Sequence, residues 1–174
     1  MGGAKPILRL WPGASAVIVL ITMYSAPGLA AGCRDMTPEL AHMTVRDMQL
    51  RGPGDRHIDL QVRIADEGSE RAAGFQHICP ETADHTSILF VFGRPNIPRF
   101  HMRNVHMPLD IAFIDSQGVI RNIQTMHPYI LGSKEEKLWG PGVPVLFVLE
   151  VKAGLFGLQG VTENEWSIVL SAPE

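Results

Sequence analysis

The sequence predicts a single, mainly β domain: a compact antiparallel β-sandwich or partly closed barrel with one or two short helices. Its 174 residues suit one domain. Short apolar or alternating runs recur between turns rich in glycine and proline, which is typical of an all-β fold. No segment has the length and 3.6-residue period of a crossover helix, so a βαβ arrangement is disfavoured. We expect residues 57–174 to form the domain, after a lead-in over residues 33–56.

The first strands and a helix are expected before residue 93. Residues 43–50 form a weak strand, and the alternation of apolar and polar residues over 58–64 predicts a half-buried strand. Ser69 begins a short helix that ends near Gly74. The continuous apolar run over residues 88–92 predicts a buried strand.

A second group of strands follows. Residues 100–105 are expected to form a strand that Pro108 interrupts, and the strand resumes over residues 109–114. Residues 115–118 (DSQG) predict a type I turn with a left-handed glycine, which makes a three-residue hairpin loop with a bulge. The remaining strands are expected over residues 119–125, 145–151 and 165–170, with a short helix between the last two.

Residues 1–32 are expected to be an export signal outside the domain. Lys5 and Arg9 give a positively charged start, residues 14–24 are apolar, and residues 25–32 are small. The apolar run is too short to span a membrane comfortably, although a retained N-terminal anchor is the alternative interpretation. We therefore expect the protein to be exported, to the periplasm or to the surface of a membrane.

Cys33 is a candidate lipidation site. Residues 29–33 (LAAGC) resemble the cleavage box of bacterial lipoproteins, but ordinary cleavage after residue 30, 31 or 32 fits equally well. A lipid on Cys33 would anchor the protein to a membrane and leave Cys79 as a lone thiol, whereas the two cysteines could pair if no lipid is added. A domain of roughly 140 residues can bury a sufficient core without a disulfide. We therefore expect Cys79 to be a small core residue.

The charge of the chain bears on its partners. Removal of the signal also removes two basic residues and no acidic one, which lowers the formal net charge from −3 to −5. An acidic domain without a cluster of lysine and arginine argues against a nucleic-acid partner. The expected partner is an envelope protein or a small ligand.

Four separated motifs resemble those of a bacterial and archaeal family, domain of unknown function 192. They are ERAAGF (residues 70–75), ILFVF (88–92), FHMRNVHMPLDIAFIDSQGVI (100–120) and VLEVKAG (148–154), in the order and spacing of that family. The resemblance covers about residues 58–170. It implies a compact β-sandwich and frequent export, and it implies no catalytic residues because the family has no accepted ones.

The resemblance also indicates a binding surface. Met102, Asn104, Asp110 and Glu150 match characteristic polar or semi-polar positions of the family, whereas His101 stands where the family usually has tryptophan. Any function that depends on that tryptophan is therefore not expected here. We take these five residues as candidate binding residues.

Histidine and methionine pairs give a candidate metal site. Thioethers and imidazoles together suit copper, especially Cu(I). A three-residue hairpin loop would set Met107 opposite His127, whereas a two-residue loop would set Met107 opposite Met126 and His106 opposite His127. The plainer interpretation is that these methionines pack in the core. Apart from copper, no cofactor is expected.

The sequence therefore predicts an exported cell-envelope protein and favours a small binding or accessory module over an enzyme. One alternative is a periplasmic copper-binding protein. The other is an envelope hydrolase in which Asp110 and Glu150 share a cleft as general acid and base. If Glu150 is buried instead, Arg71 or Arg103 is its expected partner.

Overall fold

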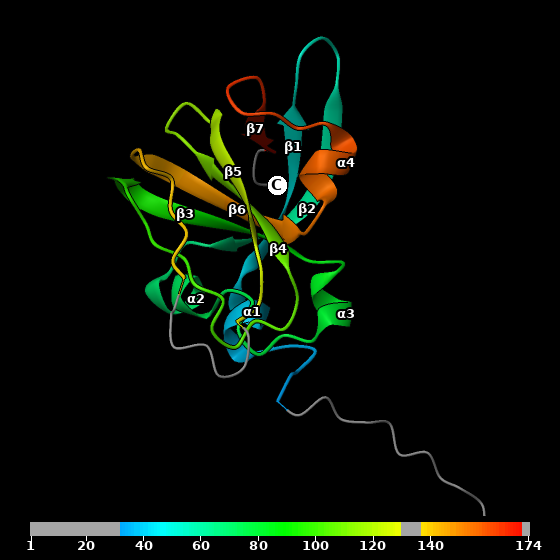
Figure 1. The fold of residues 1–174 in the computed structure, drawn as a ribbon, viewed down its shortest axis with the longest axis vertical. Helices are drawn as coiled ribbons and strands as arrows, with labels where there is room; N and C mark the ends of the chain where they lie inside the picture. The colour runs from blue at the N-terminus through cyan, green and yellow to red at the C-terminus, as the bar shows by residue number, and fades with distance from the viewer. Residues whose placement is uncertain (1–31, 130–136, 172–174) are drawn as a thin grey trace, which may run out of the picture.

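A single curled β-sheet is the framework of the molecule (Figure 1). The computed structural model describes residues 32–129 and 137–171, so the expected export signal, apart from Gly32, lies outside the described residues. No helix in these ranges is both long and apolar enough to cross a bilayer. The helices and strands are α1 (Pro38–His42), β1 (Thr44–Arg51), β2 (His57–Ala65), α2 (Gly68–Ala73), α3 (Pro80–Ala83), β3 (Ser87–Asn96), β4 (Leu109–Ile114), β5 (Ile120–Met126), β6 (Val145–Lys152), α4 (Leu155–Gln159) and β7 (Ser167–Leu170).

The seven strands lie in the order β5-β4-β6-β3-β2-β1-β7. The two outer strands approach each other at one end, where the Ile168 amide donates to the Gly118 carbonyl at 2.8 Å and Ile120 donates to Trp166 at 2.9 Å. Gly118 suits this contact because its φ is +83° and a Cβ there would lie 3.1 Å from the Ile168 oxygen. The prediction of a mainly β domain is confirmed, and of its two forms the partly closed barrel is the one observed.

One pair of strands runs in parallel, contrary to the expectation that βαβ connections are absent. β2 and β3 pair through Val62 and Ser87, and residues 66–86 cross over between them through α2 and α3. Two short helices make this connection in place of one long helix. Helices this short show no 3.6-residue hydrophobic period that could be recognised in the sequence. The first begins at Gly68, where the Glu70 carboxylate accepts the amides of Asp66 and Glu67 at 3.1 Å. The connection is long enough for a parallel pairing, which needs a dozen or more residues.

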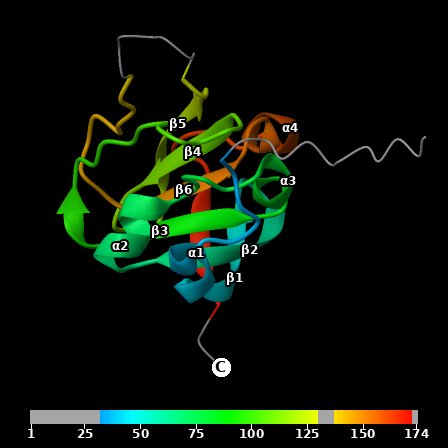
Figure 2. The same ribbon diagram turned by 90° about the horizontal axis from the view of Figure 1, so that it is seen from below.

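The sheet separates two apolar clusters. In β4, alternate side chains point to opposite faces, so Ile111 and Phe113 join one cluster while Ala112 and Ile114 join the other. The first cluster lies toward α1, α2 and α3, which Figure 1 shows grouped at one end of the molecule and Figure 2 shows from below. The second cluster includes Phe156 of α4. Both faces of β4 are therefore buried, and Asp110 is its one charged residue.

Residues 97–108 form an irregular segment, which we call the 97–108 loop. The expectation of a strand over residues 100–105 is wrong, because only Phe100 makes a β-bridge, to Trp139. Asn104 has a left-handed backbone with φ of 57°, and its carbonyl accepts the His77 amide at 2.8 Å. The loop folds onto the first apolar cluster and buries Met102 there.

The hairpin between β4 and β5 has the predicted turn. Asp115 accepts the amides of Gln117 and Val119 at 2.9 Å, and its other oxygen pairs with Arg121 at 2.6 Å. Burial alone would raise the pKa of Asp115, but these backbone hydrogen bonds and the Arg121 guanidinium outweigh it and lower that pKa. A bulge at Arg121 then shifts the pairing by one residue, from Ile114–Ile120 to Phe113–Asn122.

Cys33 and Cys79 form a disulfide, with their Cα atoms 4.9 Å apart. The expectation that Cys79 is a core residue is wrong, because it lies half-buried just before α3, where the N-terminal segment reaches it. Arg34 holds this contact by donating to His77 at 2.7 Å and accepting from Cys79 at 2.9 Å. The disulfide uses the sulfur of Cys33 that lipidation would require, so the two states of Cys33 exclude each other.

Candidate functional site

A cavity of about 260 Å³ lies between α2, β3, β6 and the 97–108 loop. Four phenylalanines line it: Phe75, Phe90, Phe92 and Phe100. The Phe90 and Phe100 rings meet edge to face with their centroids 5.1 Å apart, which is a favourable aromatic arrangement. The polar side chains of the lining are Arg71, Gln76, Arg99, His101 and Glu150. An apolar wall with a few polar groups is typical of a small-molecule site.

Glu150 enters the cavity from the middle of the sheet. It pairs with Ile88 of β3 and Ile111 of β4, so its side chain shares a face with theirs. Its side of the sheet is covered by the turn after α2, where a Cβ at Gly74 would lie 3.8 Å from the Glu150 Oε2 atom and 3.4 Å from Phe90. Only 5 % of Glu150 is exposed.

No hydrogen bond or ion pair to the carboxyl group of Glu150 occurs within the described part of the chain, and burial is the one cause that acts on its pKa. Burial alone raises its pKa to about 8, because the charged form loses its hydration. Near pH 7 the group is therefore mainly a neutral acid, which can donate a hydrogen bond.

The expected partners of Glu150 lie elsewhere. Arg71 donates through one terminal nitrogen to the carbonyls of Val91, at 3.1 Å, and of Asp66. Its guanidinium also lies over the Phe92 ring, 5.7 Å from the centroid. Arg103 is exposed and does not line the cavity. Arg71 therefore contributes positive charge to the cavity wall without neutralising Glu150.

The 97–108 loop adds two basic side chains to the wall. Arg99 is exposed, and none of the described residues makes a hydrogen bond or ion pair with its guanidinium. The His101 Nδ1 atom lies 3.2 Å from the Arg103 amide and accepts its hydrogen. A neutral His101 therefore carries its proton on Nε2.

Asp110 faces away from this cavity. It pairs with Val151, the neighbour of Glu150 in β6, so the two carboxylates point to opposite faces of the sheet. Its oxygens accept the Thr125 hydroxyl and the Gly154 amide, each at 2.8 Å. The expected cleft shared by Asp110 and Glu150 is therefore not formed, and Asp110 instead anchors the chain where it enters α4.

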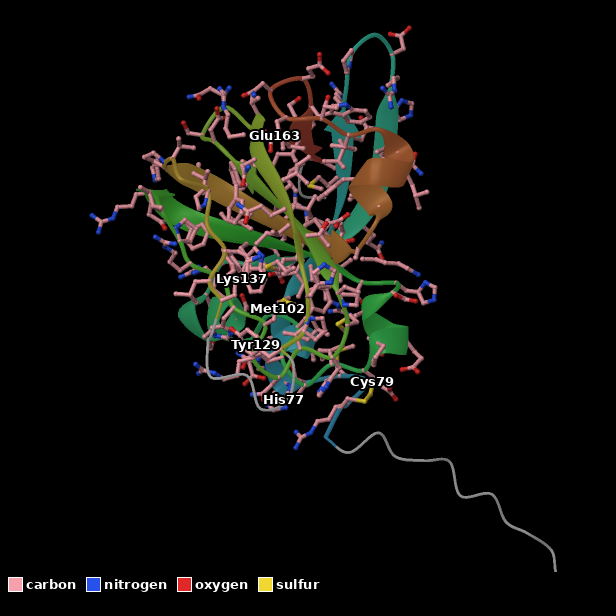
Figure 3. All side chains as sticks on the ribbon, in the orientation of Figure 1. His77, Cys79, Met102, Tyr129, Lys137 and Glu163 are labelled. Atoms are coloured by element: carbon pink, nitrogen blue, oxygen red, sulfur yellow. A yellow bond between two sulfur atoms is a disulfide. The ribbon has the colours of Figure 1, made fainter. Side chains whose placement is uncertain are left out.

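The other two candidate binding residues support the loop. Met102 is only 1 % exposed and belongs to the first apolar cluster; Figure 3 shows it inside the molecule. Asn104 is exposed and donates its side-chain amide to the Gln76 carbonyl oxygen at 3.4 Å. Of the five predicted binding residues, the structure brings only His101 and Glu150 together at the cavity.

The predicted copper ligands are not brought together either. Met107 and Met126 are buried in the first cluster, whereas His106 and His127 are exposed. Neither expected register holds, since the bulge sets Met126 opposite Leu109, and Met107 precedes β4. Within residues 32–129 and 137–171, no three side chains of histidine, cysteine, aspartate or glutamate are placed to hold a metal ion.

Two polar lining residues, Gln76 and Arg99, were not predicted, and Arg71 was expected only as a partner of Glu150. The three residues come from a turn, a loop and a short helix, so no periodic pattern connects them. The four family motifs could have indicated these residues, because each motif contributes lining residues to this cavity. The contributions are Arg71 and Gly74 from the first, Phe90 and Phe92 from the second, Phe100 and His101 from the third, and Glu150 from the fourth.

Comparisons with known proteins give the fold and the family. A crystal structure from Sinorhizobium meliloti 1021, of a protein called a "putative transcription regulator", is 28% identical, with a TM-score of 0.64 over 74% of this chain and 95% of that one. A protein of unknown function from Novosphingobium aromaticivorans DSM 12444 is 22% identical, with a TM-score of 0.64 over 80% and 94% of the chains, and shares the fold. A search of curated proteins found no match. The model of the DUF192 family, described as an uncharacterized ACR, matches residues 49–165, which is more than half of the chain, and the protein therefore belongs to this family.

Proposed function

We propose that this protein is an exported binding module of the cell envelope whose cavity at Glu150 holds a small organic molecule. The observation that carries the proposal is the Glu150 carboxyl group, which is buried at the cavity and has no partner among the described residues. Buried polar groups are nearly always hydrogen-bonded, since an unsatisfied one costs about 1–3 kcal/mol. Such a group is retained at a site where a ligand supplies the missing bond.

The size of the cavity limits the ligand. A volume of about 260 Å³ corresponds to roughly nine water molecules at liquid density. The site therefore suits a molecule of about ten non-hydrogen atoms, with an apolar body against the phenylalanine rings. A peptide or a sugar chain would exceed this space.

Two features support export. Residues 1–32 have the charge, apolar run and small residues of a signal peptide. The Cys33–Cys79 disulfide is a bond that persists in oxidising compartments and is rare in the cytosol. We do not extend the regulator description of the Sinorhizobium protein to this chain, because its 18 acidic residues exceed its 15 lysines and arginines.

A fragment titration tests the binding function. The full chain, purified from the envelope fraction of an expressing bacterium, is titrated with small aromatic and aliphatic anions, amines and alcohols while amide NMR shifts are recorded. Binding at the cavity moves the amides of Gly74, Gln76 and His101. If no compound of any charge moves these amides at millimolar concentration, the binding function is wrong.

A cavity-filling variant gives the control. Ala73→Phe places a ring in the cavity wall and is expected to abolish the shifts, and Ala72→Phe is a second variant in the same wall. Leu158→Phe adds the same ring on α4, at a residue that is 88% exposed, and is expected to leave them unchanged. Equal binding by the Ala73→Phe and Leu158→Phe variants would place the ligand elsewhere.

A further inference from the structure

We propose that the ligand of this cavity is a small organic anion, with its apolar body against the phenylalanine rings, its charged group on Arg99 and Arg71, and a hydrogen bond from Glu150 to its inner end. This deepens the proposed function and rests on it. The charges of the lining residues and their free hydrogen-bond donors determine the class of ligand.

The charge of the lining favours an anion. Among the lining residues that the structure describes, Arg71 and Arg99 are positive, and Glu150 is the only acid. Because burial keeps Glu150 mainly neutral near pH 7, the lining carries about two positive charges and no compensating negative one. An apolar-walled cavity of one charge sign attracts ligands of the opposite sign.

The arginines also have donors to spare. The hydrogen bonds of Arg71 to Asp66 and Val91 use one terminal nitrogen, so its other terminal nitrogen and Nε have no bond within the described residues. Arg99 has none of its donors engaged there. A guanidinium presents paired N–H groups that match a carboxylate, and such charge-assisted bonds are about twice as strong as neutral ones.

Glu150 is suited to donate to such a ligand. A cationic ligand would first have to remove the proton from Glu150, and it would share the cavity with two guanidinium groups. An anionic ligand needs no such ionisation, because the neutral acid already carries the proton for a hydrogen bond. The groups that face Glu150 across the cavity are consistent with this assignment: Arg71 on α2, Arg99 and His101 on the 97–108 loop, and only phenylalanines on β3.

The dependence on pH follows with a definite sign. Ionisation of Glu150 removes the donor and adds a charge that repels the anion. The affinity for an anion is therefore expected to fall about tenfold between pH 7 and pH 9, as Glu150 titrates around pH 8. A His101→Gln variant is measured beside the native protein, because His101 is the other titratable side chain of the 97–108 loop that lines the cavity.

The experiment compares ligands that differ mainly in charge. The full chain is titrated by calorimetry with benzoate, benzylamine and benzyl alcohol, and with hexanoate, hexylamine and hexanol. One of the two anions is expected to bind at least tenfold more tightly than its matched amine and alcohol at pH 7. Arg99→Gln is expected to weaken that anion about tenfold, whereas Arg94→Gln, which removes the same charge from an exposed residue outside the lining, is expected to have little effect.

Glu150→Gln distinguishes the two charge classes of ligand. Glutamine keeps a neutral donor, so this variant is expected to bind the anion within a few-fold of the native affinity and to lose the fall between pH 7 and pH 9. If the amine binds more tightly than the anion and the Glu150→Gln variant loses this binding, the anion assignment is wrong but the binding function stands. The same conclusion follows if the alcohol binds as tightly as the anion. Failure of all six compounds would overturn both.

Discussion

Asp110 and Glu150 occupy neighbouring strands, one position apart in register, and face opposite sides of the sheet. Asp110 pairs with Val151, and Glu150 pairs with Ile111. The Asp110 side chain therefore lies on the same face as Val151, and the Glu150 side chain lies on the opposite face with Ile111. The Asp110 carboxylate has protein partners for both oxygens, whereas Glu150 has none among the described residues. Substitutions at these two positions should therefore have opposite consequences for stability.

Replacing Glu150 by glutamine should stabilise the protein increasingly as the pH rises. The folded-state pKa of Glu150 is about 8, above the value of 4.5 for the free side chain, so the folded state holds the extra proton. The destabilisation that burial of the Glu150 charge causes is absent below about pH 4.5 and grows between pH 4.5 and pH 8. Above pH 8 it levels at about 5 kcal/mol. Denaturation of Glu150→Gln and native protein at pH 4.5, 6 and 8 measures this difference. Glu163→Gln is the control, because Glu163 is exposed and lies outside the cavity lining. A difference that does not grow with pH would contradict the unpaired burial of Glu150.

Replacing Asp110 by alanine should destabilise the fold without changing the charge preference of the cavity. The change removes the acceptors of the Thr125 hydroxyl and the Gly154 amide, and we expect a loss of roughly 2–3 kcal/mol. Urea denaturation gives the loss, and benzoate titration gives the affinity. A variant that unfolds normally but loses ligand binding would show that Asp110 belongs to the site after all.

Removing the disulfide should destabilise the protein by about 4 kcal/mol at most, from the loop entropy of a bridge between residues 46 apart. The variant is Cys33→Ser with Cys79→Ser, and the measurement is urea denaturation with and without a reductant. Only the native protein is expected to respond to the reductant. The intact mass of the purified protein separates the two states of Cys33, since a disulfide lowers the mass and a lipid raises it.

Replacing Asp115 by asparagine should cost roughly 1–3 kcal/mol, because the mostly buried Asp115 loses its charge-assisted hydrogen bonds and its pair with the partly exposed Arg121. The pKa of Asp115 is lowered in the folded state, so its contribution is present above the ordinary aspartate value and is lost as the pH falls through the folded-state value. The matched control is Asp84→Asn, whose partner Lys152 is on the surface, and we expect less than about 1 kcal/mol there. Equal losses in the two variants would contradict the structural role of the hairpin turn.

The parts of the fold with local signals were predictable from the sequence. The apolar run at 88–92 became part of β3, the strand predicted over 109–114 became β4, and Asp115 and Gly118 marked the turn between β4 and β5. The bulge at Arg121 had no such signal, and its one-residue shift changed every cross-strand pair that the copper hypothesis needed. The parallel pairing of β2 with β3 was missed because its crossover is made of short helices without a readable period.

The site was predictable only in part. Glu150 stood out as a charge in an apolar strand, and His101 as a departure from the family pattern. The partners of Glu150 could not be inferred, because which face of β6 it occupies depends on the register with β3 and β4. Arg71 was expected as a salt-bridge partner, but backbone carbonyls hold it instead.

The contact between Gly118 in the β4–β5 hairpin and Ile168 in β7 can form only late in folding, after the C-terminal strand has been synthesised. β7 covers one side of β1, and its first residue bridges to Val119, so both outer strands are protected only when the last described residues are in place. A chain that ends before Trp166 would present two unpaired strand edges to other chains. Synthesis that stops short of these residues should therefore yield chains that aggregate, and the strand edges stay open to self-association until the C-terminal segment is in place.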